Sequence, residues 1–138
     1  MRNYDVEKEA HSKKEFDLIY MLPEHPNIIS AKEFIVTESW TYLVLECADG
    51  KELQDYVNES LLSKDNIKKI MIQLLSAIAH LHKHLICHKD IKPENIIFNP
   101  LSLSIKIIDF NISQIVKDDS FTMFSCTGTE KFMAPEML

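Results

Sequence analysis

The stretch HKDIKPEN, residues 88–95, brings together the polar side chains that one kind of chemistry requires. Transfer of a phosphoryl group to a hydroxyl needs a carboxylate that orients the hydroxyl and accepts its proton. It also needs a cation near the transferred phosphate and oxygen ligands for magnesium. Asp90, Lys92 and Asn95 can supply these groups in that order. Because Asn95 follows Asp90 by five residues, both side chains can project from one loop into one cleft.

A second acidic position follows in IIDFN, residues 107–111. Asp109 leaves an apolar, strand-like run. Carboxylate oxygen is a natural ligand for the hard cation Mg²⁺, which also keeps waters and phosphate oxygens. We therefore predict that Asn95 and Asp109 are metal ligands and that Asp90, Asn95 and Asp109 converge on one cleft. The segment GTEKFMAPE, residues 128–136, comes after them.

These motifs resemble those of eukaryotic protein kinases. HKDIKPEN resembles the catalytic loop, DFN resembles the metal-binding DFG motif, and GTEKFMAPE resembles the end of the activation segment. Their joint occurrence, in order and at family spacing, makes the resemblance specific, and it runs from about residue 7 to the C-terminus. It implies an α+β, partial kinase-like fold in one incomplete domain, 1–138. Residues 1–46 would be a remnant of the small lobe, and 47–138 the start of the large lobe.

The resemblance also implies an ATP site. Glu15 would be the glutamate that pairs with the ATP-anchoring lysine. The nucleotide would be held by Leu45 as gatekeeper, by the backbones of Glu46 and Ala48, by Glu52 at the ribose, and by Ile97 on the adenine face. An apolar column between the lobes would contain Ile19, Ala31, His88 and Phe110, although alanine is small for that role.

Two features resemble serine/threonine kinases more than tyrosine kinases: Lys92 within KPEN, and the Gly128-Thr129 element. By this resemblance, Thr129 supports Asp90 and Lys92 through hydrogen bonds. Ser125 lies where many kinases are phosphorylated, so we expect an upstream kinase to act there, with Ser120, Thr122 and Thr127 as alternatives. We expect His88 to be a structural histidine bonded to backbone.

The expected function is ATP- and Mg²⁺-dependent phosphorylation of protein Ser/Thr hydroxyls by a full-length parent. The alternative is a pseudokinase-type or truncated regulatory module without catalysis. It is motivated by two departures: neither a glycine-rich loop nor a V-A-I-K-type lysine precedes Glu15, and Asn111 replaces the DFG glycine. Lys89 in place of the usual arginine is a third departure from the family pattern. We accordingly expect little phosphotransfer from the chain as given. We also expect strain at Asn111 if the turn there needs a positive φ.

Hydrophobic periodicity predicts the elements that carry these motifs. Helices are expected at 7–22, 52–57 and 64–85, and strands at 27–36, 40–46, 95–98 and 104–108. Ser63 is the expected N-cap of the long helix, and the helix's apolar stripe, from Ile67 to Leu85, is expected to be core.

Composition narrows the partners and the compartment. A net charge of -6 argues against a nucleic-acid-binding domain. No apolar run reaches the roughly 18 residues that span a bilayer, so no membrane partner is expected. Three dispersed cysteines, Cys47, Cys87 and Cys126, fit a reducing cytoplasmic or nuclear compartment. We expect the first two to be small buried hydrophobes, and the histidines at 25, 80, 82 and 84 to be surface or capping residues.

Overall fold

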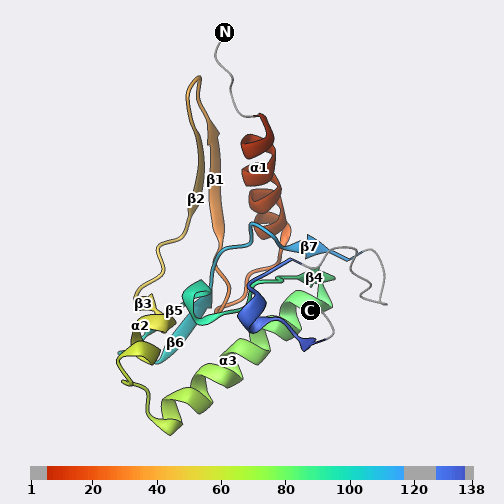
Figure 1. The fold of residues 1–138 in the computed structure, drawn as a ribbon. Helices are drawn as coiled ribbons and strands as arrows, with labels where there is room; N and C mark the ends of the chain where they lie inside the picture. Colours follow the sequence, from red (N-terminus) through yellow and green to blue (C-terminus); the bar gives the residue numbers. More distant parts are fainter. Residues whose placement is uncertain (1–5, 117–126, 136–138) are drawn as a thin grey trace.

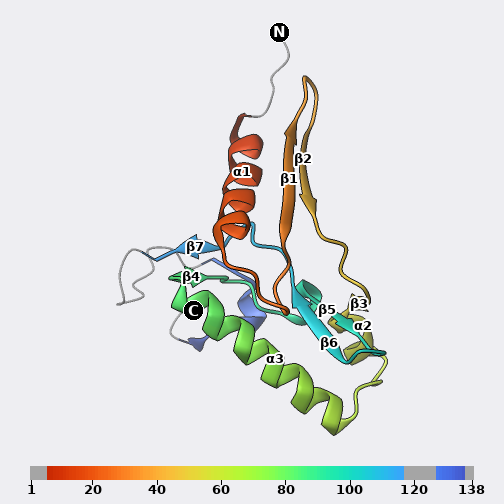
Figure 2. The same cartoon turned by 180° about the vertical axis from the view of Figure 1, so that it is seen from behind.

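The computed structural model describes residues 6–116 and 127–135, which form an upper and a lower part (Figure 1). In the upper part, helix α1 (Val6–Met21) stands beside the hairpin of β1 (Ala31–Val36) and β2 (Thr41–Leu45). Helix α3 (Lys64–Lys83), the short helix α2 (Leu53–Asn58) and a three-stranded sheet lie below, and the view from behind shows the same division (Figure 2). Helices segregated from small antiparallel sheets confirm the predicted α+β class.

Helix α1 is fixed to the hairpin by one apolar face. Leu18 and Ile19 are buried, and the ring of Phe16 packs on Phe34 with 5.5 Å between centroids. Pro23 follows the helix and cannot donate a backbone hydrogen bond to continue it. The predicted helix at 7–22 is therefore confirmed within one residue at each end.

The predicted strand at 27–36 is shorter than expected, because its first four residues join the upper part to the lower part instead. Buried Asn27 donates through Nδ2 to Gln73 Oε1 on α3 and to Ile105 O, both at 2.9 Å. Two backbone hydrogen bonds also cross this junction. Ile107 N donates to Asn27 O at 2.9 Å, and Ile29 N donates to Ile107 O at 3.0 Å. These bonds fix the lower end of the hairpin against the sheet.

Helix α3 begins at the predicted cap and ends earlier than predicted. Ser63 Oγ accepts a hydrogen bond from Asn66 N at 3.1 Å, which satisfies one of the free donors of the first turn. The helix ends at Lys83 rather than at Leu85, because Leu85 has a φ of 56°, outside the α-helical region.

The apolar stripe of α3 is only partly core. Its buried members are Ile70, Leu74, Ala77 and Leu81. In the described part of the chain, Ile67, Met71 and Leu75 are 46%, 45% and 59% exposed, so their assignment to the core is wrong here. Periodicity identifies the apolar residues of a helix, whereas burial also requires a neighbouring element that covers them.

Two small sheets carry the functional loops. β3 (Lys51–Glu52), β5 (Ile96–Asn99) and β6 (Ser104–Ile107) form an antiparallel sheet in the order β3-β5-β6, and β4 (Ile86–Cys87) pairs with β7 (Gln114–Ile115). Glu52 therefore ends a strand and does not begin the predicted helix. Gly50 allows the chain to enter β3 with a φ of 127°, where a Cβ would clash with Phe98 O.

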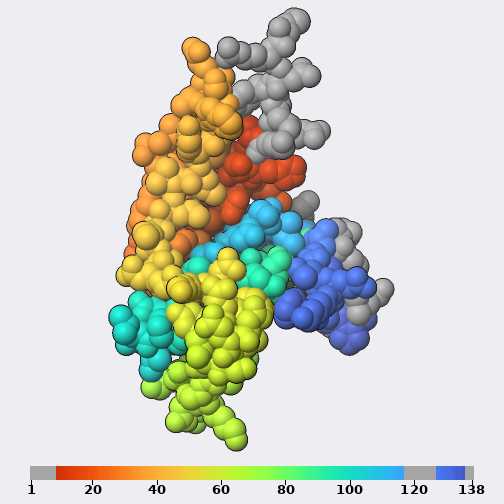
Figure 3. Space-filling view, turned by 60° about the vertical axis from the view of Figure 1, so that its left-hand side comes forward, coloured from red at the N-terminus to blue at the C-terminus, as the bar shows by residue number. Residues whose placement is uncertain are grey.

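One apolar core runs through both parts, and the space-filling view shows the hairpin resting on the lower part (Figure 3). Ile19 and Ile28 from above belong to the same cluster as Phe98 and Ile107 from below. Between residues 6 and 116 and between 127 and 135, no helix is both long and apolar enough to cross a membrane.

Candidate active site

The HKDIKPEN stretch forms the loop between β4 and β5, and it closes with a 3₁₀ turn, η1 (Pro93–Asn95). Proline at the first position of this turn has no N–H to leave unpaired. The turn brings Asn95 back toward the start of the loop. Asp109 lies two residues beyond the end of β6, the strand that pairs with β5. Short strands and a tight turn therefore place these polar side chains near one another.

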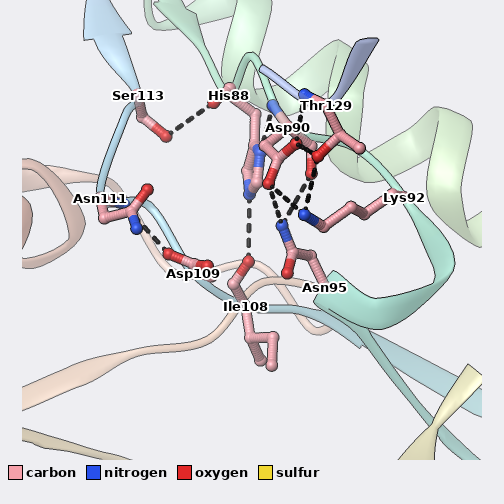
Figure 4. A network of polar contacts seen from close by, with 9 residues as sticks. All are labelled: His88, Asp90, Lys92, Asn95, Ile108, Asp109, Asn111, Ser113 and Thr129. Atoms are coloured by element: carbon pink, nitrogen blue, oxygen red, sulfur yellow. Dashed lines mark hydrogen bonds and ion pairs between the residues drawn. The ribbon is translucent and has the colours of Figure 1, made fainter. Parts of the chain in front are cut away.

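Asp90 is surrounded by hydrogen-bond donors (Figure 4). Its Oδ1 accepts from Thr129 N at 3.1 Å and from Thr129 Oγ1 at 2.6 Å. Its Oδ2 accepts from Asn95 Nδ2 at 2.9 Å and from Lys92 Nζ at 2.8 Å. Burial by itself raises the pKa of this carboxyl. The hydrogen bonds from Lys92, Thr129 and Asn95 outweigh burial and lower the pKa to about 2.

Thr129 connects the loop to the segment that follows residue 126. Lys92 Nζ donates to Thr129 Oγ1 at 2.8 Å, and that hydroxyl donates in turn to Asp90. The predicted support of Asp90 and Lys92 by Thr129 is confirmed. The hydrogen bond from Lys92 to Asp90 raises the pKa of the lysine.

His88 is the predicted structural histidine. Its Nδ1 accepts from Asp90 N at 3.3 Å, so the ring proton lies on Nε2, which donates to Ile108 O at 3.1 Å. Burial lowers its pKa and keeps the imidazole neutral. Its ring lies 4.6 Å from that of Phe110, and both residues are buried with Ile19. Ala31 is only half-buried, so its place in the predicted column stays a prediction.

Asn95 joins Asp90 to the backbone between β6 and Asp109. Its Nδ2 donates to both Asp90 O and Asp90 Oδ2 at 2.9 Å, and its backbone carbonyl accepts from Ile108 N at 2.9 Å. Asn95 thus ties Asp90 to the backbone just before Asp109 (Figure 4). The convergence of Asp90, Asn95 and Asp109 on one cleft stays a prediction.

The strain expected at Asn111 lies instead at Asp109. Asp109 has a φ of 63°, whereas Asn111 is not among the described residues with a positive φ. Aspartate tolerates this region because its short carboxylate can bond the local backbone. Here Asp109 Oδ1 accepts from Asn111 N at 3.3 Å. The interpretation of Asn111 as a strained substitute for glycine is therefore wrong.

Glu15 reaches this turn from α1. Its Oε1 accepts from Phe110 N at 3.1 Å. Burial raises its pKa, the Phe110 N–H lowers it, and the negative charge of Asp109 raises it further. Glu15 is therefore not an ordinary solvated helix charge. Its pairing with a nucleotide-anchoring lysine stays a prediction.

The residues expected at the adenine and ribose lie at the junction of the two parts. Leu45 and Ala48 pack on the core cluster from the end of β2 and the following segment. Exposed Glu52 is the register partner of Ile97 across β3 and β5. The contacts of these residues with a nucleotide stay a prediction.

The cysteines and the activation-segment residues differ in how far the structure describes them. Cys47 is exposed, so its assignment as a buried hydrophobe is wrong, whereas Cys87 is half-buried. Of the predicted activation-segment residues, Ser120, Thr122, Ser125 and Cys126 lie outside the described residues, and Thr127 is exposed.

The predicted surface and capping histidines form a column of rings. The centroids of His25 and His80 lie 4.9 Å apart, and those of His80 and His84 lie 4.5 Å apart. His84 Nδ1 contacts His80 O at 2.8 Å near the end of α3. Within the described ranges, no group of three or more His, Cys, Asp or Glu side chains is arranged to hold a metal.

Sequence reasoning missed Lys106 in β6. Its Nζ lies 2.7 Å from Glu46 Oε1, and it donates to Ile28 O at 3.3 Å. The sequence feature that could have identified it is a single lysine inside the apolar run Ile105–Ile108, on the strand that leads to Asp109.

The family pattern of the protein kinase domain matches residues 1–138. The chain belongs to the protein kinase family. It is 37% identical over 139 residues to calcium-dependent protein kinase 6 of Plasmodium berghei, covering 99% of this chain and 9% of that protein. Against the SNF1-like protein kinase ssp2 of Schizosaccharomyces pombe, it is 36% identical over 132 residues, which are 94% of this chain and 22% of that protein.

A probable serine/threonine-protein kinase, fhkC of Dictyostelium discoideum, is 40% identical over 117 residues, covering 83% of this chain and 20% of that protein. This kinase-domain chain spans between 9% and 26% of the length of such relatives. The relatives are named as kinases, and none of these comparisons favours the non-catalytic alternative. Protein kinases generally use ATP and Mg²⁺.

The kinase-domain residues fit Mg²⁺ by the chemistry of their donors. Mg²⁺ typically takes one or two protein carboxylate or carbonyl ligands and completes its shell with waters and phosphate oxygens. Both hydrogen bonds of the Asn95 amide nitrogen go to Asp90, which fixes the side chain and leaves its Oδ1 for a cation. Asp109 binds Asn111 N through Oδ1, which leaves Oδ2.

Proposed function

We propose that the full-length protein is a serine/threonine protein kinase that transfers the γ-phosphoryl group of ATP to hydroxyl groups of a protein substrate. The observation that carries this proposal is Asp90, whose carboxylate is held by Lys92, Thr129 and Asn95 at the junction with the Asp109 strand. Phosphoryl transfer depends mainly on positioning and electrostatic stabilisation, and a carboxylate fixed by three side chains meets the first requirement.

Asp90 orients the acceptor hydroxyl. With a pKa of about 2, it is ionised at neutral pH and accepts the hydroxyl hydrogen bond as an anion. A carboxylate with so low a pKa is a weak base. We therefore infer that it takes the proton late, when the acceptor oxygen has begun to bond to phosphorus. Such timing suits the loose transition state of this reaction.

Lys92 holds positive charge beside the acceptor position. Its ammonium group is bonded to Asp90 and Thr129, which fixes a point charge where the three equatorial oxygens of the moving phosphoryl group gather negative charge. Asn95 and Asp109 would hold Mg²⁺ through Oδ1 and Oδ2. Bound Mg-ATP supplies the phosphoryl donor and neutralises charge on its phosphates.

The adenine and ribose would be bound by the residues that precede and follow the loop. These are Leu45, the backbones of Glu46 and Ala48, Glu52 and Ile97. Glu15 would position the phosphate-anchoring lysine of the full-length protein. The boundary of the two lobes would fall near residue 46, where β2 gives way to an extended segment.

The proposal extends to regulation and to the cellular compartment. An upstream kinase would act at Ser125, where a phosphate could meet Lys89 as a point charge. The protein would work in the cytoplasm or nucleus, as its dispersed cysteines suggest.

The test is phosphotransfer by the full-length protein with Mg-ATP and a Ser/Thr-containing protein substrate. Asp90→Asn keeps the shape of the side chain, removes its charge, and should lower kcat by roughly 10²–10⁴-fold. Asp17→Asn is the matched control, because it removes a carboxylate from the exposed Lys13–Asp17 pair on α1 and not from the Asp90 network. The control should match wild type. A wild-type protein that transfers no phosphate, or an Asp90→Asn variant with unchanged kcat, would contradict the proposal.

A further inference from the structure

The segment after β2, Glu46 to Asp49, would bind adenine in the proposed site. Its backbone meets the upper part where Glu46 N donates to Ser30 O at 2.9 Å. Beyond that bond it runs toward β3 without regular secondary structure. A binding segment of this kind needs a second anchor if it is to keep one position.

The side chain of Glu46 supplies that anchor. Its Oε1 accepts from Ser30 N at 2.9 Å and lies 2.7 Å from Lys106 Nζ. Lys106 Nζ also donates to Ile28 O at 3.3 Å. The contacts join the end of β2, the segment before β1 and the middle of β6. Burial opposes the ionisation of Glu46, but the bonds from Lys106 and Ser30 outweigh it and lower its pKa.

Lys106 is also one of a row of residues across the small sheet. Glu52 pairs with Ile97, and Ile97 pairs with Lys106. Directly opposed residues of antiparallel strands project from the same face, so all three lie on one side. Two of them are the residues expected at the ribose and the adenine. The third is bonded to the segment that would bind the adenine edge.

The pair is half-buried and stands beside open space. The side chains of Lys106 and Glu46 are 25% and 23% exposed. Together with Ile97 they line a hollow of about 360 Å³, and both also line a larger one of about 520 Å³ on the side of His25. Because hollows flank the pair, we expect little packing to hold the segment if the ionic contact is lost.

We infer that the Glu46–Lys106 pair is a positioning device for adenine: it holds the 46–48 backbone at a fixed distance from Ile97 and thereby sets the affinity for adenine nucleotides. This inference rests on the proposed function. Lys106 would act through Glu46 and not by touching the nucleotide, and the pair would also couple that segment to β6, the strand that leads to Asp109.

The test measures the Kd values of Mg-ATP and Mg-CTP for the full-length protein by calorimetry. Lys106→Met should raise the Kd for ATP by roughly tenfold, because a displaced backbone loses its aligned contacts. The Kd for CTP should hardly change, because the phosphate and metal contacts are untouched. Lys106→Arg keeps the cation and should restore ATP binding to near wild type.

A double variant separates this role from general stabilisation. Glu46→Gln with Lys106→Met should weaken ATP binding no more than Lys106→Met alone, since both changes remove one interaction. Asp17→Asn serves again as the ion-pair control and should leave both Kd values unchanged. A lower melting temperature with an unchanged ATP Kd, or tighter ATP binding in Lys106→Met, would overturn the inference. A wild type that binds no Mg-ATP would instead overturn the proposed function itself, and the inference with it.

Discussion

Asp90 and Glu15 are two carboxylates of the same candidate site with opposite surroundings. Asp90 receives hydrogen bonds from Thr129, Asn95 and Lys92, and its pKa falls to about 2. Glu15 is half-buried, accepts one hydrogen bond from Phe110 N and faces the negative charge of Asp109, and its pKa rises.

The difference shows that the two carboxylates of the site do not have the same need for a cation. The donors to Asp90 come from its own loop and from Thr129, so this anion is already stabilised in the described chain. Glu15 loses solvent without gaining a comparable set of donors, so its anion is costly until a cation approaches. In the family, a lysine has that role. The first three changes below test this contrast and the fourth tests the turn after Asp109. They run from the largest expected effect on stability to the smallest.

Asp90→Asn should lower the free energy of unfolding by about 2 kcal/mol at pH 7, because a pKa lowered from 3.8 to about 2 measures the stabilisation of the anion. The side chain is only 11% exposed, so solvent screens little of this effect. The amide NH₂ of the asparagine would also replace one of the two carboxylate oxygens, each of which now accepts hydrogen bonds. Urea denaturation provides the measurement, and unfolding midpoints that coincide with wild type would remove the first half of the contrast.

Thr129→Val should lower the free energy of unfolding by about 1.5 kcal/mol, because it removes the hydroxyl that donates to Asp90 and accepts from Lys92. Thr129 N still donates to Asp90, so the loss should be smaller than for Asp90→Asn. Thr129→Ser keeps the hydroxyl and is the control. Equal unfolding energies for the valine and serine variants would show that the hydroxyl does not support the network.

Glu15→Gln should stabilise the described fold by less than about 1 kcal/mol, because the amide oxygen still accepts from Phe110 N while the charge facing Asp109 is gone. The sign is opposite to that for Asp90→Asn. A folded-state pKa above the ordinary 4.5 means that the folded protein binds the proton more tightly than the unfolded one. The cost in stability from Glu15 therefore develops as the pH rises above 4.5 and is complete above the folded pKa.

The advantage of Glu15→Gln over wild type should accordingly shrink as the pH falls from 7 toward 4.5. Unfolding curves of both proteins across this range measure the difference directly. An advantage that grows on acidification would mean that the pKa of Glu15 is lowered and that a cation already pairs with it.

Asn111→Gly should lower stability by about 0.5 kcal/mol. Asn111 does not occupy a positive φ, so glycine relieves no strain there and only adds freedom to the unfolded chain. Thermal unfolding of the two proteins is the measurement. A glycine variant that is more stable than wild type would restore the interpretation of Asn111 as a strained residue.

The catalytic-loop network could be predicted because its information is local. Asp90 and Asn95 are separated by one turn, and the motif that contains them fixes their relative positions. Thr129 was predictable through its own motif, and His88 through its place before Asp90. Residue order and spacing were enough for all of these.

Contacts that depend on packing between distant segments were not predictable. Lys106 meets Glu46, sixty residues away, and Gln73 meets Asn27 across the junction of the two parts. Neither pairing leaves a periodic pattern in the sequence. Similarly, the exposure of Cys47 and Met71 depends on which elements cover them, which residue type alone does not reveal. The positive φ at Asp109 comes from the turn as a whole, so a comparison at Asn111 alone could not locate it.

The most direct test of the central claim is the Mg²⁺ dependence of ATP binding by the full-length protein, compared between wild type and Asp109→Asn. Binding should tighten on addition of Mg²⁺ in wild type by roughly tenfold or more, and this gain should largely vanish in the Asp109→Asn variant, because one hard anionic ligand of the cation is lost. Asp17→Asn should retain the full gain. ATP binding that is insensitive to Mg²⁺ in wild type, or equally sensitive in the Asp109→Asn variant, would contradict the account of Asp109 as the metal ligand of a kinase site.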